Sequence, residues 1–447
     1  MSGRNETSRR RLAQPISRRR FLYGAATALG GLAVTGCGAV SIGGTGRKVD
    51  FWNLFGGGDG ARLGAMESTF RKENPDVQLE STTLAWGAPY YTKLSMSAVG
   101  GRPPEVAILH QTHLASYAPA GLLEPLDPQL LSEFDIGPDN FLPTILESSK
   151  YEGEIYTIPL DTHPFIQYYN TDICKKAGLL GPDDELKPLE GPDAVIEALK
   201  KAKEVTGDLG LSFYAADSAG PWRLFYTLYG QLDGSPIVSP DAREVTVDEE
   251  KSLQALEFMV ALSQDAEVVA VDLDYGGSVA EFLSGNAGFH WNGDWEVTTY
   301  QDADLPFSML PFPNVFGENH TSQADRHTFV IPKQPTKDPR AMEPAFQFIS
   351  SMLKNSLIWA KGGHIPAYLP VAESEEYRKL SPQSNYVEVA DNVVLDPEAW
   401  FSGSGSTMEQ RASSTFQTAM AGRLTPKQAF AELRAMLQEF VDTPKPV

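Results

Sequence analysis

The spacing of hydrophobic residues alternates along the chain between the period of a strand and the period of a helix. Residues 49–52 are typical of a strand, and the glycine-rich stretch 56–60 ends it. The next apolar residues recur at helical spacing until Asn74-Pro75: Leu63, Met66 and Phe70. Residues 77–79 and 106–109 predict two further strands. Strands that alternate with helices favour an open α/β sheet with parallel pairing.

The middle and the end of the chain predict more helix. Apolar positions at helical spacing occur in three later segments: Val195, Leu199 and Ala202; Leu253, Leu256 and Val260; Phe430, Leu433, Leu437 and Val441. The last segment follows Thr425-Pro426, a typical helix start. Prolines at 159 and 311–313 are expected where the chain passes between two lobes.

The first residues carry the pattern of an export signal. Arginines at 9–11 and 18–20 precede Phe21-Leu22 and a short run of apolar and small residues that ends at Cys37. Twin arginines before an aromatic residue and a leucine indicate the Tat route. Residues 34–37 resemble a bacterial lipobox, in which Cys37 takes the lipid. We therefore expect a signal peptide at 1–36 and a flexible, lipid-anchored tether at 37–48.

The charge of the exported part excludes some partners. The chain has 37 basic and 58 acidic residues; residues 1–36 hold seven arginines and Glu6, which leaves 30 and 57, a net charge of −27. Such a surface repels nucleic acid and anionic lipid, so membrane attachment is expected through Cys37 only. With Cys37 acylated, Cys174 has no disulfide partner and is expected to be a buried small residue.

Four blocks of sequence together resemble the bacterial extracellular solute-binding proteins of family 1, the sugar-capturing subunits of ABC importers similar to maltose-binding protein. The blocks run from a strand and glycine loop near the N-terminus to Asn292-Gly293-Asp294-Trp295, in the following order: 49–75, 93–126, 153–179 and 282–295. The resemblance covers essentially all of residues 48–440.

The resemblance implies a two-lobed periplasmic-binding-protein-like α/β fold. Each lobe is expected to be an open, mostly parallel sheet flanked by helices, with the ligand between the lobes. The first lobe is expected at residues 48–160 and 305–352, and the second at 161–304 and 353–447. Loops beyond the carboxyl ends of the strands then converge on the ligand.

The resemblance also implies a function. We expect an extracytoplasmic monomer, held on the outer face of the membrane, that captures a mono- or oligosaccharide by hinge closure and delivers it to an ABC permease. A glycerophosphodiester or another small polar solute is the alternative ligand. An exported carbohydrate-cleaving enzyme is the alternative from another class, and it would need two carboxyl groups about 5–9.5 Å apart across a sugar.

Candidate contacts follow from sugar chemistry, because sugar hydroxyls need planar polar partners and sugar C–H faces stack on aromatic rings. Such residues in the expected loops, several at positions where the family holds ligand, are Asp59, Trp86, Tyr90, His110, Gln111, Asp161, His163, Trp222, Asn292, Asp294, Trp295 and His364. His327 and Trp400 are further candidates, Asp59 also fits a helix N-cap, and Trp291 is expected in the core.

Known catalytic patterns are absent from the sequence. It contains no G-x-S-x-G, no HExxH and no G-x-x-x-x-G-K-[ST]. His110 and His113 are three apart, but no third ligand lies near them in the sequence. We therefore expect no enzymatic activity, no metal and no cofactor.

Overall fold

The computed structural model describes residues 47–335 and 339–445, which belong to one compact unit. The predicted signal peptide, Cys37 with its expected lipid, and nearly all of the predicted tether lie outside the described residues. Within the described residues, no helix is both long enough and apolar enough to cross a bilayer.

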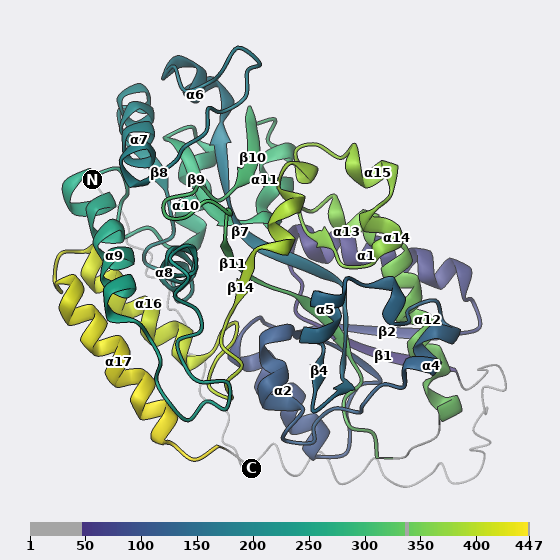
Figure 1. The fold of residues 1–447 in the computed structure, drawn as a ribbon. Coiled ribbons are helices and arrows are strands. Elements are labelled where there is room, and N and C mark those ends of the chain that lie inside the picture. Colours follow the sequence, from purple (N-terminus) through teal and green to yellow (C-terminus); the bar gives the residue numbers. More distant parts are fainter. Residues whose placement is uncertain (1–46, 336–338, 446–447) are drawn as a thin grey trace, which may run out of the picture. The chain divides into compact units, whose positions relative to one another are not determined.

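The first sheet has the strand order β2-β1-β3-β12-β6. Its strands β1 and β2 are labelled in Figure 1. Its strands are β1 (Lys48–Asn53), β2 (Gln78–Thr83), β3 (Val106–His110), β6 (Thr157–Pro159) and β12 (His327–Val330). β1 pairs in parallel with β2 and β3, as the alternation of strands and helices predicted. β12 runs antiparallel to β3 and β6, because it enters the sheet from the other lobe.

The second sheet is built around the long strand β7 (Asp161–Asn170), and its order is β14-β11-β7-β9-β8. The other strands are β8 (Leu209–Ser212), β9 (Ala287–Gly293), β10 (Phe307–Pro311), β11 (Ser322–Asp325), β13 (Ile365–Pro366) and β14 (Val393–Leu395). β7 pairs antiparallel with β9, β10, β11 and β13. The second sheet is thus less parallel than expected. A small hairpin joins β4 (Lys150–Tyr151) and β5 (Glu154–Ile155).

Helices flank both sheets, and each predicted amphipathic helix is present. α1 (Gly57–Glu73) buries Leu63, Met66 and Phe70, and the Asn74 backbone closes its last turn. α7 (Pro192–Thr206), α9 (Glu249–Val260) and α17 (Pro426–Asp442) pack the predicted stripes against the core, although Leu253, Val260 and Val441 are only partly buried. Thr425 forms a capping box at the start of α17. Figure 1 shows α16 (Thr407–Met420) and α17 in yellow beside α8 (Gly220–Gln231) and α9.

The remaining α-helices are shorter, apart from α2 and α12. They are α2 (Ala88–Val99), α3 (Leu114–Tyr117), α4 (Pro128–Glu133), α5 (Pro143–Ser148), α6 (Thr171–Lys176), α10 (Tyr275–Leu283), α11 (Val297–Asp302), α12 (Pro339–Lys354), α13 (Ser356–Ala360), α14 (Leu369–Ala372) and α15 (Glu375–Arg378). Cys174 on α6 is buried in the core of the second lobe, as predicted.

Two predicted lobe boundaries need correction. The chain leaves the first sheet after Pro159, as expected, but β10 and β11 still pair with β7, so residues 311–313 are no crossing. The return comes at Arg326, between β11 and β12, rather than at 305. The boundary at 352 is also too early, because Trp359 and Tyr368 pack in the core of the first sheet.

Candidate functional site

A cavity of about 290 Å³ lies between segments of the two sheets. Its aromatic lining is Phe55, Trp86, Tyr214, Tyr275 and Trp295, and its charged or ionisable lining is Asp59, His110, His163, Asp217, Arg223, His327 and His364. Asp59 follows β1 and His110 ends β3 of the first sheet, whereas Tyr214 and Trp295 follow β8 and β9 of the second. Strand ends of both sheets therefore supply the site, as open α/β sheets usually do.

Trp295 is a half-buried aromatic wall of this cavity. Its indole Nε1 donates to Tyr275 Oη at 2.7 Å, and the Arg223 guanidinium lies 5.0 Å from the ring centroid. The hydrogen bond and the cation–π contact fix the orientation of the ring. A rigid ring of this kind can stack on a sugar face at a small entropic cost.

Asp161 forms the buried floor beneath the cavity. Its Oδ1 accepts from the His327 backbone N–H at 2.9 Å and from His163 Nδ1 at 3.0 Å. Its Oδ2 accepts from Trp359 Nε1 at 2.6 Å and from His327 Nδ1 at 2.8 Å. Burial alone would raise the pKa of Asp161, but His327, His163 and His364 together hold it well below the ordinary value. Asp161 is thus an ionised carboxylate whose hydrogen bonds orient the neighbouring imidazoles.

Two imidazoles of the cavity wall are neutral. Burial lowers the pKa of His163 to about 3 and that of His110 well below its ordinary value. His110 Nδ1 is 2.6 Å from Tyr91 Oη, so a protein partner holds this ring too. The His163 and His327 rings stack with centroids 4.1 Å apart. The neutral His110 and His163 rings can exchange hydrogen bonds with hydroxyl groups without carrying charge.

His364 joins carboxylates from both lobes. Its Nε2 is 3.1 Å from Asp59 Oδ1, and its Nδ1 is 3.4 Å from Asp161 Oδ2. Burial opposes protonation, but Asp59 and Asp161 outweigh it and raise the pKa of His364 to about 9. Gly363 has φ +114°, and a Cβ there would lie 1.8 Å from the Asp294 carbonyl oxygen, so only glycine allows this approach.

Burial raises the pKa of Asp294 well above its ordinary value, although His364 Nδ1 is 3.8 Å from Oδ1. At that distance Asp294 makes no hydrogen bond to His364. Asp59 lies in the first turn of α1, where a carboxylate is favourable, and not at the N-cap, which is Gly56.

The structure brings together six of the predicted site residues at the cavity surface: Asp59, Trp86, His110, His163, Trp295 and His364. Asp161 and Asp294 lie directly behind them. Asn292 is buried too, with its Nδ2 3.4 Å from Tyr275 Oη, so it supports the wall rather than lining it.

Three predicted contacts are wrong for this cavity. Tyr90 is a core residue whose hydroxyl donates to the Ile108 carbonyl at 2.6 Å. Trp222 is fully buried on Tyr226, because Gly220-Pro221 begins helix α8 and turns the ring inward. Gln111 points away from the cavity and accepts from Thr157 Oγ1 at 2.8 Å. Trp291 is in the core, as expected.

Sequence reasoning missed Tyr214, Asp217, Arg223 and Tyr275. Tyr214 comes just after β8, so the rule that selected His110 would have found it. Asp217 and Arg223 flank the start of α8, and Tyr275 begins α10. Only the fold shows that these helix starts face the cavity.

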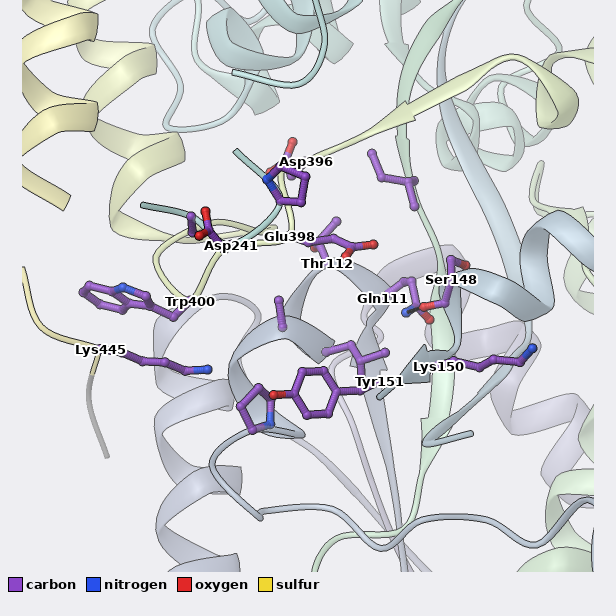
Figure 2. A pocket seen from close by; sticks show the side chains of 16 residues that line it. Gln111, Thr112, Ser148, Lys150, Tyr151, Asp241, Asp396, Glu398, Trp400 and Lys445 are labelled. Atoms are coloured by element: carbon purple, nitrogen blue, oxygen red, sulfur yellow. Dashed lines mark hydrogen bonds between the residues drawn. The ribbon is translucent and has the colours of Figure 1, made fainter. Parts of the chain in front are cut away.

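A second cavity, of about 310 Å³, contains Gln111 and Trp400 (Figure 2). Figure 2 shows Trp400 and Lys445 on one side and Ser148 and Lys150 on the other, with Asp241, Asp396 and Glu398 above. Trp400 and Tyr151 make this cavity the alternative place for a sugar. It lacks the fixed imidazole and carboxylate floor of the first cavity.

His113 gives a prediction about acid stability. Its Nε2 donates to the Ser404 carbonyl at 2.8 Å, and burial lowers its pKa to about 4 from 6.5. The unfolded chain takes up the proton first, so this stability is present above pH 6.5 and is lost as the pH falls to 4. His113→Gln keeps a donor at the same place without titrating.

The variant's free energy of unfolding, relative to the wild type, should therefore rise by about 3 kcal/mol between pH 6.5 and pH 4. Urea unfolding of both proteins across this range measures the difference. A difference that does not vary with pH would show that the folded state protonates His113 freely.

A model of the bacterial extracellular solute-binding protein family matches residues 58–356, about two thirds of the chain. The chain belongs to this family. A binding protein of Brucella abortus is 28% identical over 134 residues, which are 30% of this chain and 32% of that protein. The chain thus spans about a third of the length of this relative.

A longer match is the maltooligosaccharide ABC transporter solute-binding lipoprotein of Streptococcus pneumoniae R6. It is 21% identical, over 68% of this chain and 72% of that lipoprotein. Among solved structures, the GacH receptor of Streptomyces glaucescens, studied unliganded and with acarbose, superposes with a TM-score of 0.73 at 20% identity. The superposition covers 89% of this chain and 99% of that one.

These solved structures confirm the predicted fold class. The family member described here is a two-lobed, maltose-binding-protein-like α/β protein with one large sheet in each lobe. The first cavity lies where strand ends of the two sheets meet, the position that the sequence analysis predicted for a ligand.

Proposed function

We propose that this family member captures a mono- or oligosaccharide in the first cavity and delivers it to an ABC permease. The observation that supports this most directly is the composition of the cavity wall, where Trp295 is fixed beside Asp59, Asp217 and the neutral imidazoles. Aromatic faces match sugar C–H surfaces, and short carboxylates and imidazoles match hydroxyl groups. The cavity volume is near the lower end of the range for small-molecule sites.

Named relatives support a carbohydrate ligand. The Streptococcus pneumoniae relative is named for maltooligosaccharides, and the Listeria monocytogenes substrate-binding protein was solved with cycloalternan at a TM-score of 0.72. The lobes carry separate parts of the wall, so a ligand that touches both favours the closed form. We propose that the protein acts as a monomer.

A carbohydrate-binding role without cleavage fits the family, whose members are named as binding proteins. Asp161 is fully buried and accepts hydrogen bonds from four donors, so it is a positioning group rather than an acid or a nucleophile. Burial raises the pKa of Asp294 well above its ordinary value, and its side chain is fully inaccessible. We therefore propose that the protein leaves its sugar intact.

A thermal-shift screen tests the ligand class. The purified protein is heated with mono- and oligosaccharides and, as the alternative, with glycerophosphodiesters. A ligand at about 100 times its Kd adds about 2.7 kcal/mol to the folded state. The proposal expects a rise in Tm with at least one sugar, and chromatography should recover that sugar unchanged. A rise with glycerophosphodiesters alone would reject the carbohydrate ligand.

We further propose that Cys37 carries a lipid and holds the protein on the outer face of the cell membrane. The pattern at residues 34–37 supports this, as does the lipoprotein name of the pneumococcal relative. Cys37→Ala is expected to release the protein or leave it unprocessed, because the lipid is its proposed attachment. Mass spectrometry of the wild-type protein checks the modification, and an unmodified Cys37 in an unprocessed chain would contradict it.

A further inference from the structure

Four metal-ligating side chains meet where the chain crosses between the two sheets. Asp161 and His163 begin β7, His327 begins β12, and His364 precedes β13. One ligand atom from each lies within 4.8 Å of all the others, and all four side chains are buried. Three separate crossing segments therefore contribute to one compact group.

The spacing within this group matches a shared ion. The Nδ1 atoms of His327, His163 and His364 are 2.8, 3.0 and 3.4 Å from carboxylate oxygens of Asp161, and the two shorter contacts are the hydrogen bonds that an ion would replace. In a tetrahedral zinc site with bonds of about 2.1 Å, neighbouring ligand atoms are about 3.4 Å apart. The ring centroids of the three histidines are 4.1, 5.5 and 6.0 Å apart. Metal-bound imidazoles have centroids about 5 Å apart by the same geometry.

Buried polar atoms without a hydrogen-bond partner lie at this group of four side chains. His364 Nδ1 is fully buried and makes no hydrogen bond, although Asp161 Oδ2 is 3.4 Å away. Both carboxyl oxygens of Asp294 are likewise buried without a partner, and Oδ1 is 3.8 Å from His364 Nδ1. Buried polar atoms are nearly always paired, so this concentration of unpaired ligand atoms indicates a bound group.

The other nitrogen of His364 has the partner that metal-binding histidines usually have. Its Nε2 is 3.1 Å from Asp59 Oδ1, and its ring stacks on Trp359 with centroids 4.5 Å apart. A carboxylate on the outer nitrogen fixes the ring and the tautomer, which leaves the inner nitrogen as the ligand.

We propose that the protein binds one divalent transition-metal ion, of the zinc, cobalt or nickel kind, through Asp161, His163, His327 and His364. Three imidazoles and one carboxylate select such ions over magnesium and calcium, which prefer oxygen ligands. Asp294 lies beside the ion as a further oxygen ligand or an outer partner. The ion binds side chains from the three crossing segments and so holds these segments together at the hinge. This site does not depend on the identity of the sugar.

The test uses purified protein that has been treated with a chelator and dialysed. Calorimetric titration with Zn²⁺ is expected to show one ion per chain, and Co²⁺ is expected to give the intense visible absorption of a tetrahedral site. The double variant His163→Gln/His327→Gln removes two ligands and should weaken Zn²⁺ binding by more than about a hundredfold. His320→Asn, outside the cluster, is the matched control and should bind as the wild type does.

Weak or multiple Zn²⁺ binding by the wild type, or equal binding by the double variant, would overturn the proposal. If the double variant does not fold by circular dichroism, the Co²⁺ spectrum of the wild type decides, because the weak absorption of an octahedral ion contradicts the ligand set. Sugar binding is measured separately on the chelated and the Zn²⁺-loaded protein. The experiment can therefore reject the metal proposal without rejecting the carbohydrate proposal, and it can reject the carbohydrate proposal without rejecting the metal proposal.

Discussion

Asp161→Asn is expected to destabilise the folded protein by about 3–5 kcal/mol, the usual cost of breaking a buried charged network. The carboxylate accepts from four donors: the His327 backbone N–H, His327 Nδ1, His163 Nδ1 and Trp359 Nε1. An asparagine amide replaces one acceptor by an N–H₂ group that faces these donors. At least one buried donor then loses its partner. Urea unfolding measures the loss.

Asp59→Asn is the matched control for this experiment. Asp59 is partly exposed, and its one side-chain hydrogen bond in the structure is to His364. Its replacement should therefore cost less than that of Asp161, because one partner rather than four donors loses its carboxylate. Equal losses of stability in the two variants would mean that the four hydrogen bonds of Asp161 do not stabilise the cavity floor as described.

Trp295→Ala is expected to weaken carbohydrate binding by about 1–3 kcal/mol, as an anchoring aromatic does at a buried contact. This corresponds to about a ten- to hundredfold rise in Kd. The ring is half-buried at the cavity wall, so the free energy of unfolding should change much less than for a core residue. Calorimetric titration and a melting curve on the same preparation measure both effects.

Trp222→Phe is the matched control for Trp295. Trp222 is buried in the second lobe, and its Nε1 donates to Asp396 Oδ1 at 2.9 Å, away from the first cavity. This change should lower the melting temperature and leave the sugar affinity of the folded protein nearly unchanged. The reverse outcome, with affinity lost at Trp222 and kept at Trp295, would move the site to another surface.

Local patterns were sufficient to predict elements whose periodicity is set by burial on one side. The stripe Leu63, Met66 and Phe70 becomes the buried face of α1, and the alternation at Val49 and Phe51 becomes β1. The antiparallel partners of β7 could not be predicted in this way, because alternation shows which face is buried and not which strand lies alongside. The boundaries at 305 and 352 came from the family resemblance, and the pairing of β10 with β7 and the packing of Trp359 in the first core show that they are misplaced.

The site was partly predictable, because the sequence indicates where strands end. Residues at or just beyond the ends of strands, such as His110 and Trp295, reach the cavity because strand ends converge there. Trp222 was misassigned, because a Gly-Pro pair reads as a loop but here begins a buried helix. The histidine cluster could not be foreseen, since His163, His327 and His364 are far apart in sequence and meet only through the register of β7 with β11 and β13.

The most direct test of the account is a crystal structure of the protein with the sugar that gives the largest thermal shift. The account predicts a sugar ring against Trp295, with hydroxyl groups within hydrogen-bond distance of Asp59 or Asp217 and of the imidazole wall. A sugar seated between Tyr151 and Trp400 in the second cavity, with the first cavity free of sugar, would contradict it.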